Sequence, residues 1–147
     1  MSTVFTKIID GTIPGRFIWQ DDVVVAFLTH APITDGHALV VPRAEIAQFV
    51  DAPDDVLARL SSVAKSVGLA QLSIWPAPRA AVLVAGFEVP HLHLHVLPAW
   101  DESHLTFAHA RTDVPPEELD AAGERLRAAL RAQGHAAHVP RTMGALD

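Results

Sequence analysis

Three histidines alternate with aliphatic residues in the segment His91–Leu97, whose sequence is HLHLHVL. In an extended segment successive side chains point to opposite faces, so His91, His93 and His95 would share one face and the aliphatic residues the other. One face would then pack into a core while the other presents imidazole rings to a ligand. We therefore predict an active-site strand. The structural alternative is a strand whose exposed face is merely rich in histidine.

The spacing of the three rings limits the chemistry that they can perform. Neighbouring histidines on one face lie about 6.6 Å apart and the outer two about 13 Å apart, from a rise of about 3.3 Å per residue. One metal ion cannot bind all three, because Zn–N bonds are only about 2.0–2.1 Å long. Two of them could form a His-x-His metal pair, but the chain has no cysteine and no HExxH motif to supply further ligands.

Composition sets the class of protein. The chain has 147 residues, half of them hydrophobic, which suffices for one domain with a sizeable core, and no apolar run approaches the about 20 residues of a membrane span. The absence of a leader and of cysteine favours a soluble, cytoplasmic protein without disulfides. A net charge of −6 disfavours duplex nucleic acid as a partner. A small phosphorylated ligand remains compatible, because backbone N–H groups and a few histidines can bind it.

Periodicity and turn residues predict the elements that position the histidine strand. The expected elements are a helix at Val4–Ile9, strands at Arg16–Gln20, Val23–Leu28 and Ala38–Val41, a helix that starts within Asp51–Asp55 and ends at Gly68, a strand at Ala81–Ala85, the histidine strand, and a helix at about 115–133. After Gly134 we expect a loose tail in which His135 and His138 are solvated. His104 and His109 lie in polar loop sequence, where we expect the same.

This order of elements resembles the histidine triad (HIT) family, whose signature H-φ-H-φ-H-φ-φ, with φ hydrophobic, is matched by His91–Leu97 at all seven positions. Further matching motifs are Lys7-Ile-Ile-Asp-Gly, Ala26-Phe27-Leu28 and Gly36-His37-Ala-Leu-Val-Val-Pro42. The branch with Phe-Thr-Lys-Ile-Ile near the start and Gly-Phe-Glu-Val-Pro-His at the site is similar to an actinobacterial type. The resemblance covers about Thr3 to Trp100. We therefore expect a HIT domain over residues 1–100 and a C-terminal extension over 101–147.

The resemblance implies an α+β fold with a five-stranded antiparallel sheet and flanking helices. It also implies a homodimer, formed around the helix and the edge strand, in which the sheet is continuous. The implied activity is that of a nucleotide hydrolase or transferase, which attacks the α-phosphorus of a nucleoside phosphoramidate or a dinucleoside polyphosphate.

By the same resemblance, the middle histidine, His93, is the nucleophile and forms a covalent nucleotidyl-histidine. Imidazole with an ordinary pKa near 6.5 is mostly neutral at pH 7 and can attack without losing a proton first. His95 would hydrogen-bond a phosphate oxygen or the bridging atom, His91 would orient the nucleophile, and His37 corresponds to a fourth family histidine. Imidazole N–H donors around an anionic phosphate need no metal or cofactor.

The nucleotide pocket that the family implies maps onto Val4, Phe5, Ile8 and Phe27, which are apolar as that pocket requires and equally suited to a core. At the ribose position most relatives carry Asp, but this chain has Thr29. Because hydrogen bonds to a charged group contribute roughly 1.5–3 kcal/mol, we expect ribose recognition to be weakened or altered.

Other departures concern the phosphate end and metal binding. Glu88 stands where relatives have Ser or Thr, and is either a general acid or a rim carboxylate. Ala80 and Phe87 stand, in an alignment without gaps, where relatives place polar residues. Many bacterial relatives bind structural zinc through Cys-x-x-Cys, and the equivalent positions here are Thr3 and Thr6. We predict a metal-free protein, because Zn²⁺ prefers thiolate and imidazole ligands.

Three classes of function follow from these observations. The favoured class is a nucleotide hydrolase or transferase that acts through His93. The second is a nucleotide-binding dimeric scaffold that kept the triad but lost ribose and phosphate contacts. The third, and least favoured, is a metalloenzyme that uses a His-x-His pair.

Overall fold

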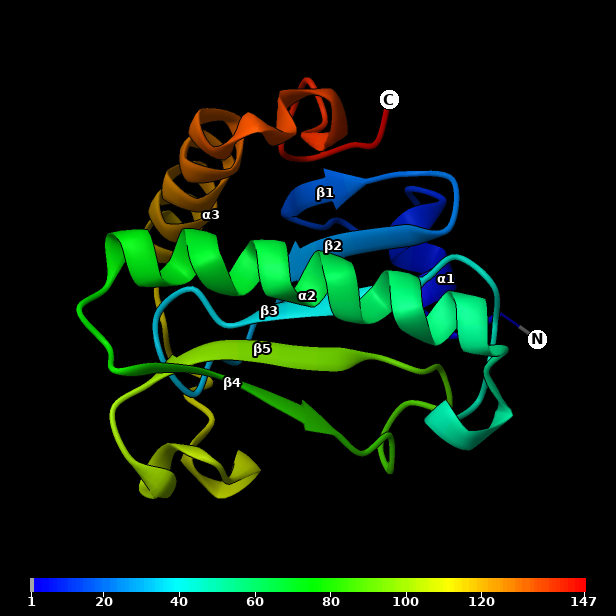
Figure 1. Ribbon diagram of the computed structural model, residues 1–147, viewed down its shortest axis with the longest axis horizontal. Coiled ribbons are helices and arrows are strands. Elements are labelled where there is room, and N and C mark those ends of the chain that lie inside the picture. The colour runs from blue at the N-terminus through cyan, green and yellow to red at the C-terminus, as the bar shows by residue number, and fades with distance from the viewer. Residues whose placement is uncertain (1) are drawn as a thin grey trace.

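The computed structural model describes residues 2–147, which form one five-stranded antiparallel sheet with flanking helices (Figure 1). The strand order is β1-β2-β3-β5-β4, and every neighbouring pair is antiparallel. In chain order the elements are α1 (Val4–Ile9), β1 (Phe17–Gln20), β2 (Val24–Leu28), β3 (Ala38–Pro42), η1 (Phe49–Asp51), α2 (Asp54–Ile74), β4 (Arg79–Val84), β5 (Leu94–Ala99), η2 (Glu102–His104), η3 (Phe107–His109), α3 (Pro116–Leu130), η4 (Arg131–His135) and η5 (Ala136–His138). The predicted α+β class is confirmed.

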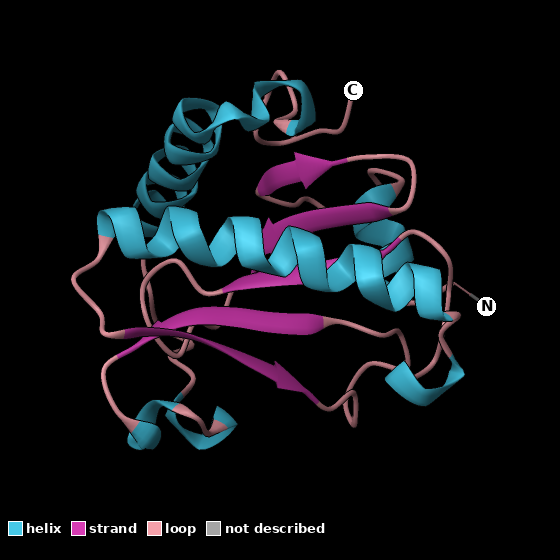
Figure 2. Ribbon diagram, in the orientation of Figure 1, coloured by secondary structure: helices cyan, strands magenta, loops and turns pink. Residues whose placement is uncertain are grey.

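The sheet separates two apolar clusters, because side chains alternate along each strand. Figure 2 shows α2 lying across one face of the sheet. There Leu60, Val63 and Val67 of α2 join every second residue of β2 and β3 in the larger cluster. In β1 a register irregularity places both Ile18 and Trp19 in this cluster. The alternate residues of β2 and β3 form the second cluster with Phe17 of β1 and Phe5 of α1. The histidine strand follows the same rule, since Leu92, Leu94 and Val96 all belong to the larger cluster. Its histidines are therefore directed towards the face of the sheet that carries α1.

Several element boundaries differ from the sequence prediction, and two of the differences have a structural reason. The helix α2 continues past Gly68 to Ile74, because this glycine serves close packing and does not end the helix. A Cβ at Gly68 would lie only 3.1 Å from the Cβ of Ala80 on β4. The histidine strand starts at Leu94, so His91 and His93 precede it. In this stretch the Leu92 N–H donates to the Ile46 carbonyl in a loop, not to a neighbouring strand.

The prediction of a loose tail after Gly134 is wrong. The Phe17 N–H donates to the Met143 carbonyl at 2.8 Å, so the tail lies along the β1 edge of the sheet. The guanidinium of Arg127, which is 2 % exposed, donates to the carbonyls of Phe17 and Pro140 at 2.8 Å each. The sequence did not reveal this docking, because the partners are backbone carbonyls, which have no sequence signature.

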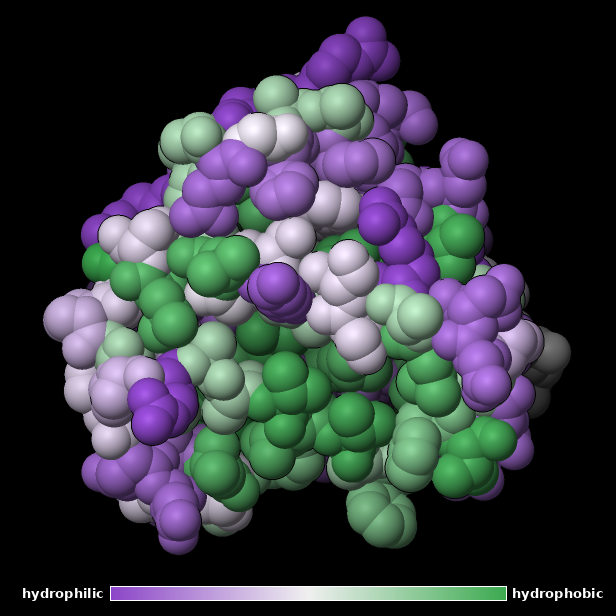
Figure 3. Space-filling view, viewed as in Figure 1, coloured by the Kyte–Doolittle hydropathy of each residue, from purple (hydrophilic) through white to green (hydrophobic). Residues whose placement is uncertain are grey.

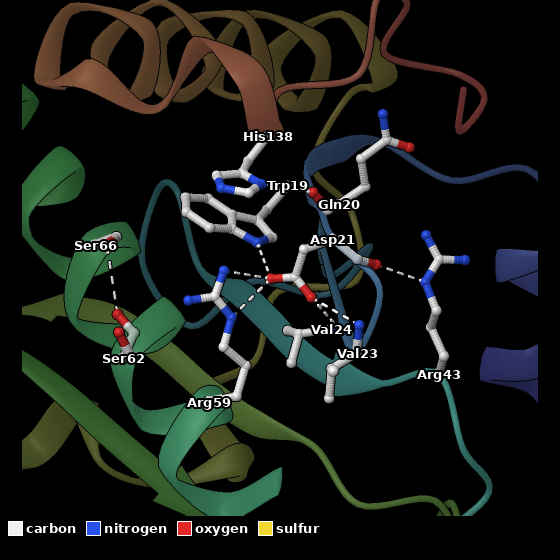
Figure 4. Close-up of polar contacts among 10 residues, drawn as sticks. All are labelled: Trp19, Gln20, Asp21, Val23, Val24, Arg43, Arg59, Ser62, Ser66 and His138. Carbon is white, nitrogen blue, oxygen red and sulfur yellow. Dashed lines mark hydrogen bonds and ion pairs between the residues drawn. The ribbon is translucent and has the colours of Figure 1, made fainter. Parts of the chain in front are cut away.

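The prediction of solvated side chains for His135 and His138 is also wrong. The His138 ring stacks on Trp19 with centroids 4.6 Å apart (Figure 4). The His135 ring lies 5.1 Å from the same indole. Beneath this stack the Trp19 Nε1–H donates to Asp21, which also forms an ion pair with Arg59 of α2 at 2.8 Å. The tail, the β1–β2 turn and α2 are thus joined at one end of the sheet. Because the tail covers β1, the edge of the sheet that no other strand covers within residues 2–147 is β4.

An exposed apolar surface lies over α2 and β4, where apolar residues gather in Figure 3. It includes Leu69, Leu72, Val82 and Val84, which are 38–53 % exposed. The groove between the helix and the strand is lined in part by Ala64, Gly68 and Ala80. Across residues 2–147, no helix is both long and apolar enough to cross a membrane.

Candidate active site

A cavity of about 770 Å³ opens between α1, the ends of the central strands and the chain that follows β5. Nine of the ten predicted site residues line this cavity: Val4, Phe5, Ile8, Phe27, Thr29, His37, Glu88, His93 and His95. They come from five separate stretches of the sequence. The tenth, His91, is fully buried beside the cavity.

His91 connects the N-terminal helix to the histidine strand. Its Nε2 lies 2.8 Å from the Pro42 carbonyl, which can only accept, so Nε2 carries the proton. In the neutral ring Nδ1 is then the acceptor, and the Thr3 hydroxyl donates to it at 2.7 Å. Thr3 also caps α1 by accepting from the Thr6 N–H. A single threonine thus fixes both the start of α1 and the orientation of the His91 ring.

The tautomer of His93 follows from one hydrogen bond. Its Nδ1 lies 2.7 Å from the His91 carbonyl, so Nδ1 carries the proton and Nε2 keeps its lone pair. Burial lowers the pKa of His93 below its ordinary value of 6.5, although the hydrogen bond to His91 opposes this shift. The ring is therefore neutral at pH 7. Phe5 packs edge-on against it, with centroids 4.8 Å apart. This arrangement suits a nucleophilic imidazole.

His37 and His95 form a hydrogen-bonded pair whose proton positions are set by the backbone. The Ile33 N–H donates to His37 Nδ1 at 3.0 Å, so the proton of the neutral His37 ring is on Nε2. That proton is donated to His95 Nδ1 at 2.9 Å, which leaves the His95 proton on Nε2. Burial lowers the pKa of His37 to about 3 and that of His95 to about 4, and neighbouring histidines add to both shifts. His95 is therefore a neutral hydrogen-bond donor, next to a ring with a free lone pair.

The apolar wall of the cavity is in part shared with the core. Phe5 and Phe27 are 7 % and 2 % exposed and belong to the second apolar cluster, and both also line the cavity with Val4 and Ile8. Their rings meet edge-on with centroids 5.6 Å apart. A flat ligand can therefore lie against this wall without any rearrangement of the core.

Thr29 and Glu88 lie at the edge of the cavity. The Thr29 hydroxyl oxygen already accepts from the Ala31 N–H at 3.2 Å, so it offers a ligand less than a carboxylate would. Glu88 is exposed, so the buried apolar setting that the general-acid hypothesis requires is absent. Phe87, beside it, is 99 % exposed.

The gapless alignment that placed Ala80 near a bound phosphate is wrong. Ala80 lies on β4, against Gly68 of α2, and lines the groove on the outer side of the sheet. Small side chains at these two positions allow the helix and the strand to approach closely. Ala80 therefore gives no information about phosphate binding.

Zinc does not fit the N-terminal positions. The Thr6 hydroxyl donates to Glu45 at 2.6 Å, the Thr3 N–H donates to the same carboxylate at 3.0 Å, and the Thr3 hydroxyl bonds to His91. These contacts form a closed hydrogen-bond network without a thiolate, which zinc prefers. Within residues 2–147, no group of three or more His, Cys, Asp and Glu side chains is placed to hold a metal ion.

Two further contacts belong to the site, and the first of them has no recognisable pattern in the sequence. The Thr3 hydroxyl bonds to His91, which lies 88 positions further along the chain. The only feature of Thr3 that the sequence shows is its position just before a helix. The Phe107 ring lies 4.7 Å from that of His95, tilted by 52°, and lines the cavity. Its neighbours His104 and His109 do not line the cavity and instead bond to backbone atoms of Trp100 and Ser103.

The chain is similar to proteins of one known family. The family model described as "HIT domain" matches residues 10–102. The chain is 32 % identical over 142 residues to an uncharacterized HIT-like protein of Mycobacterium tuberculosis, with 93 % of this chain and 99 % of that protein covered. It is 29 % identical over 136 residues to the adenosine 5'-monophosphoramidase of Schizosaccharomyces pombe, with 89 % and 100 % covered. A zinc-bound histidine triad family protein from Mycobacterium smegmatis superposes with a TM-score of 0.78 at 29 % identity, with 92 % and 98 % covered.

Proposed function

Because the chain belongs to the HIT domain family, we propose that it is a nucleotide-binding hydrolase or transferase that cleaves a nucleoside 5'-phosphoramidate through a covalent intermediate on His93. The observation that carries this proposal is the hydrogen bond from His93 Nδ1 to the His91 carbonyl, which leaves Nε2 free at the cavity. The choice of phosphoramidate follows the relative named adenosine 5'-monophosphoramidase. A dinucleoside polyphosphate is the other substrate that the triad could accept.

In the first step the Nε2 lone pair of His93 attacks the α-phosphorus, and the bond from phosphorus to the leaving nitrogen breaks. The electron pair of that bond stays on the leaving nitrogen, which takes a proton from solvent at the mouth of the cavity, where the exposed Glu88 stands. The His95 Nε2–H donates to a phosphate oxygen as negative charge grows there. Because the His37–His95 pair holds this donor in place, little reorganisation is needed.

In the second step water attacks the phosphorus, and the bond from phosphorus to His93 Nε2 breaks. The attacking water loses a proton to solvent, and the nucleoside monophosphate is released. Attack by another nucleophile instead of water would make the protein a transferase. Dividing the displacement into two steps lets one neutral imidazole serve first as nucleophile and then as leaving group.

The direct test uses adenosine 5'-phosphoramidate with the wild type and His93→Ala, and records intact protein mass beside released AMP. We expect an AMP adduct and AMP release on the wild type only. His93→Ala should lose at least about three orders of magnitude in kcat while it still binds the nucleotide, because the nucleophile is absent but the apolar wall is intact. Normal turnover by this variant would show that the nucleophile is a different residue.

A nucleotide-binding scaffold is the second candidate, and two observations favour it. The Thr29 hydroxyl is already engaged, and the only cation that lines the cavity among the described residues, Arg16, is paired with Asp120 at 2.7 Å. In this case the wild type would bind the nucleotide but would show neither adduct nor release. The same mass experiment therefore separates the two functions.

We also propose that two copies pair through β4 and α2 into a homodimer. The β1 edge is covered by the tail, whereas β4 is an uncovered edge with Val82 and Val84 exposed beside Leu69 of α2. An uncovered edge strand next to an apolar surface favours pairing with another strand. Antiparallel pairing of two β4 strands would extend the sheet and bury this surface.

A further inference from the structure

We propose that Phe107 determines specificity for the leaving group, and that it favours amines with a flat apolar body over charged leaving groups. This inference rests on the proposed phosphoramidate hydrolysis, because it names the group that leaves. Phe107 lies in the C-terminal extension, which the family resemblance did not cover. Three features of the structure support the proposal: the order of the rings, the anchoring of the segment and the charge of the cavity.

Four rings that line the cavity contact one another in succession, and we call this series the row. Phe5 lies 4.8 Å from His93, His93 lies 4.8 Å from His95, and His95 lies 4.7 Å from Phe107. The apolar wall for the base is at the Phe5 end. A phosphorus atom attacked by His93 and bonded by His95 would lie at the middle of the row. Because the leaving group departs opposite the nucleophile and away from the nucleoside, it is directed towards the Phe107 end.

The segment that carries Phe107 is anchored before any ligand binds. The backbone N–H of Arg111 donates to the Pro32 carbonyl at 3.0 Å, and its guanidinium forms an ion pair with Asp35 at 2.8 Å. These contacts fix the segment to the loop that precedes His37. Thr106 caps the short η3 helix by accepting from the Ala108 N–H. The Phe107 side chain is nevertheless 45 % exposed, so one part of the ring packs on His95 while another is open to the cavity. A ring held in this way can contact a ligand at a small cost in entropy.

The charge of the cavity disfavours an anionic leaving group. Among its described lining residues only Arg16 and Glu88 carry a full charge, and Arg16 is already paired with Asp120. The other lining residues that follow β5 are Ala110 and Thr112, which are uncharged. The leaving group of a dinucleoside polyphosphate carries several negative charges and would find no free cation here. An amine with an aromatic or aliphatic body meets no such penalty and can pack on Phe107.

The test compares two adenosine phosphoramidates, one that releases ammonia and one that releases 2-phenylethylamine, and adds a diadenosine polyphosphate. The readout is the ratio of kcat/KM for the phenylethyl compound to that for the unsubstituted compound. We expect the wild type to favour the phenylethyl compound by about tenfold, Phe107→Ala to bring the ratio close to one, and Phe107→Trp to keep it. Phe49→Ala is the matched control, because Phe49 is 50 % exposed and does not line the cavity.

Binding measured in a His93→Ala background separates this inference from the proposed function. Here the same two compounds are titrated by calorimetry, with and without Phe107→Ala, so no turnover is needed. If the wild type releases no AMP but the ratio of dissociation constants still depends on Phe107, the proposed function fails and the Phe107 subsite stands. The inference is overturned if Phe107→Ala changes both compounds by the same factor, or if the polyphosphate is the preferred substrate.

Discussion

Lowering the pH from 7 to 5 should destabilise the protein through its buried histidine pair. His37 and His95 are neutral in the native state, with pKa values of about 3 and about 4, whereas both rings have an ordinary pKa near 6.5 when unfolded. Between these values the unfolded chain binds more protons than the native chain, so the free energy of unfolding falls as the pH falls. The change begins near pH 6.5, above the range in which carboxylates such as Asp21 titrate.

The magnitude follows from the shift at His37, whose side chain is only 2 % exposed. Protonation of this one residue in the unfolded state at pH 5 lowers the free energy of unfolding by about 2 kcal/mol, at 1.36 kcal/mol per pKa unit. His95 acts in the same direction. Because the two rings share one hydrogen bond, they titrate as a pair and their contributions are not simply additive. We expect the pair to lower the free energy of unfolding by about 2–4 kcal/mol in total.

The assay is urea denaturation at pH 7, 6 and 5, followed by the fluorescence of the three tryptophans. His37→Gln is the informative variant, because its amide can still donate to His95 but does not titrate. Its loss of stability between pH 7 and 5 should be about 2 kcal/mol smaller than that of the wild type. His30→Gln, at an exposed position of the same cavity, should behave as the wild type does. Equal pH slopes for His37→Gln and the wild type would refute the reasoning.

Three further predictions follow from the structure. Thr29→Asp should bind adenosine monophosphate about tenfold more tightly than the wild type, because a carboxylate can accept from both ribose hydroxyls. The 2'-deoxy compound should gain little affinity. Equal gains for the two compounds in calorimetry would mean that the ribose binds elsewhere. Val82→Asp should be monomeric in light scattering, since it introduces charge at the exposed β4 edge, and an unchanged dimer mass would exclude this interface. Arg127→Met should lower the free energy of unfolding by about 2–4 kcal/mol in urea, because two buried carbonyls lose their donor, whereas a value near zero would mean that the tail contributes little.

The sequence alone determined the class of fold and most of the candidate site. Period-two alternation across His91–Leu97 placed the leucines in the core and the histidines on the opposite face, because a strand that is buried on one side has no other register. Short runs bounded by turn residues predicted the three strands that precede α2. Nine of the ten predicted site residues line one cavity, because the motifs that carry them are short and each lies on or next to a predictable element.

Only the tertiary structure decided which nitrogen of each imidazole carries a proton. That choice depends on the Pro42 carbonyl for His91 and on the Ile33 N–H for His37, and backbone groups look alike in every sequence. The docking of the tail on β1 and the contact of Phe107 with His95 were also decided only by the tertiary structure. Local patterns encode which face a side chain occupies, whereas the partner that it meets there depends on how distant segments pack, and this packing has no local signal.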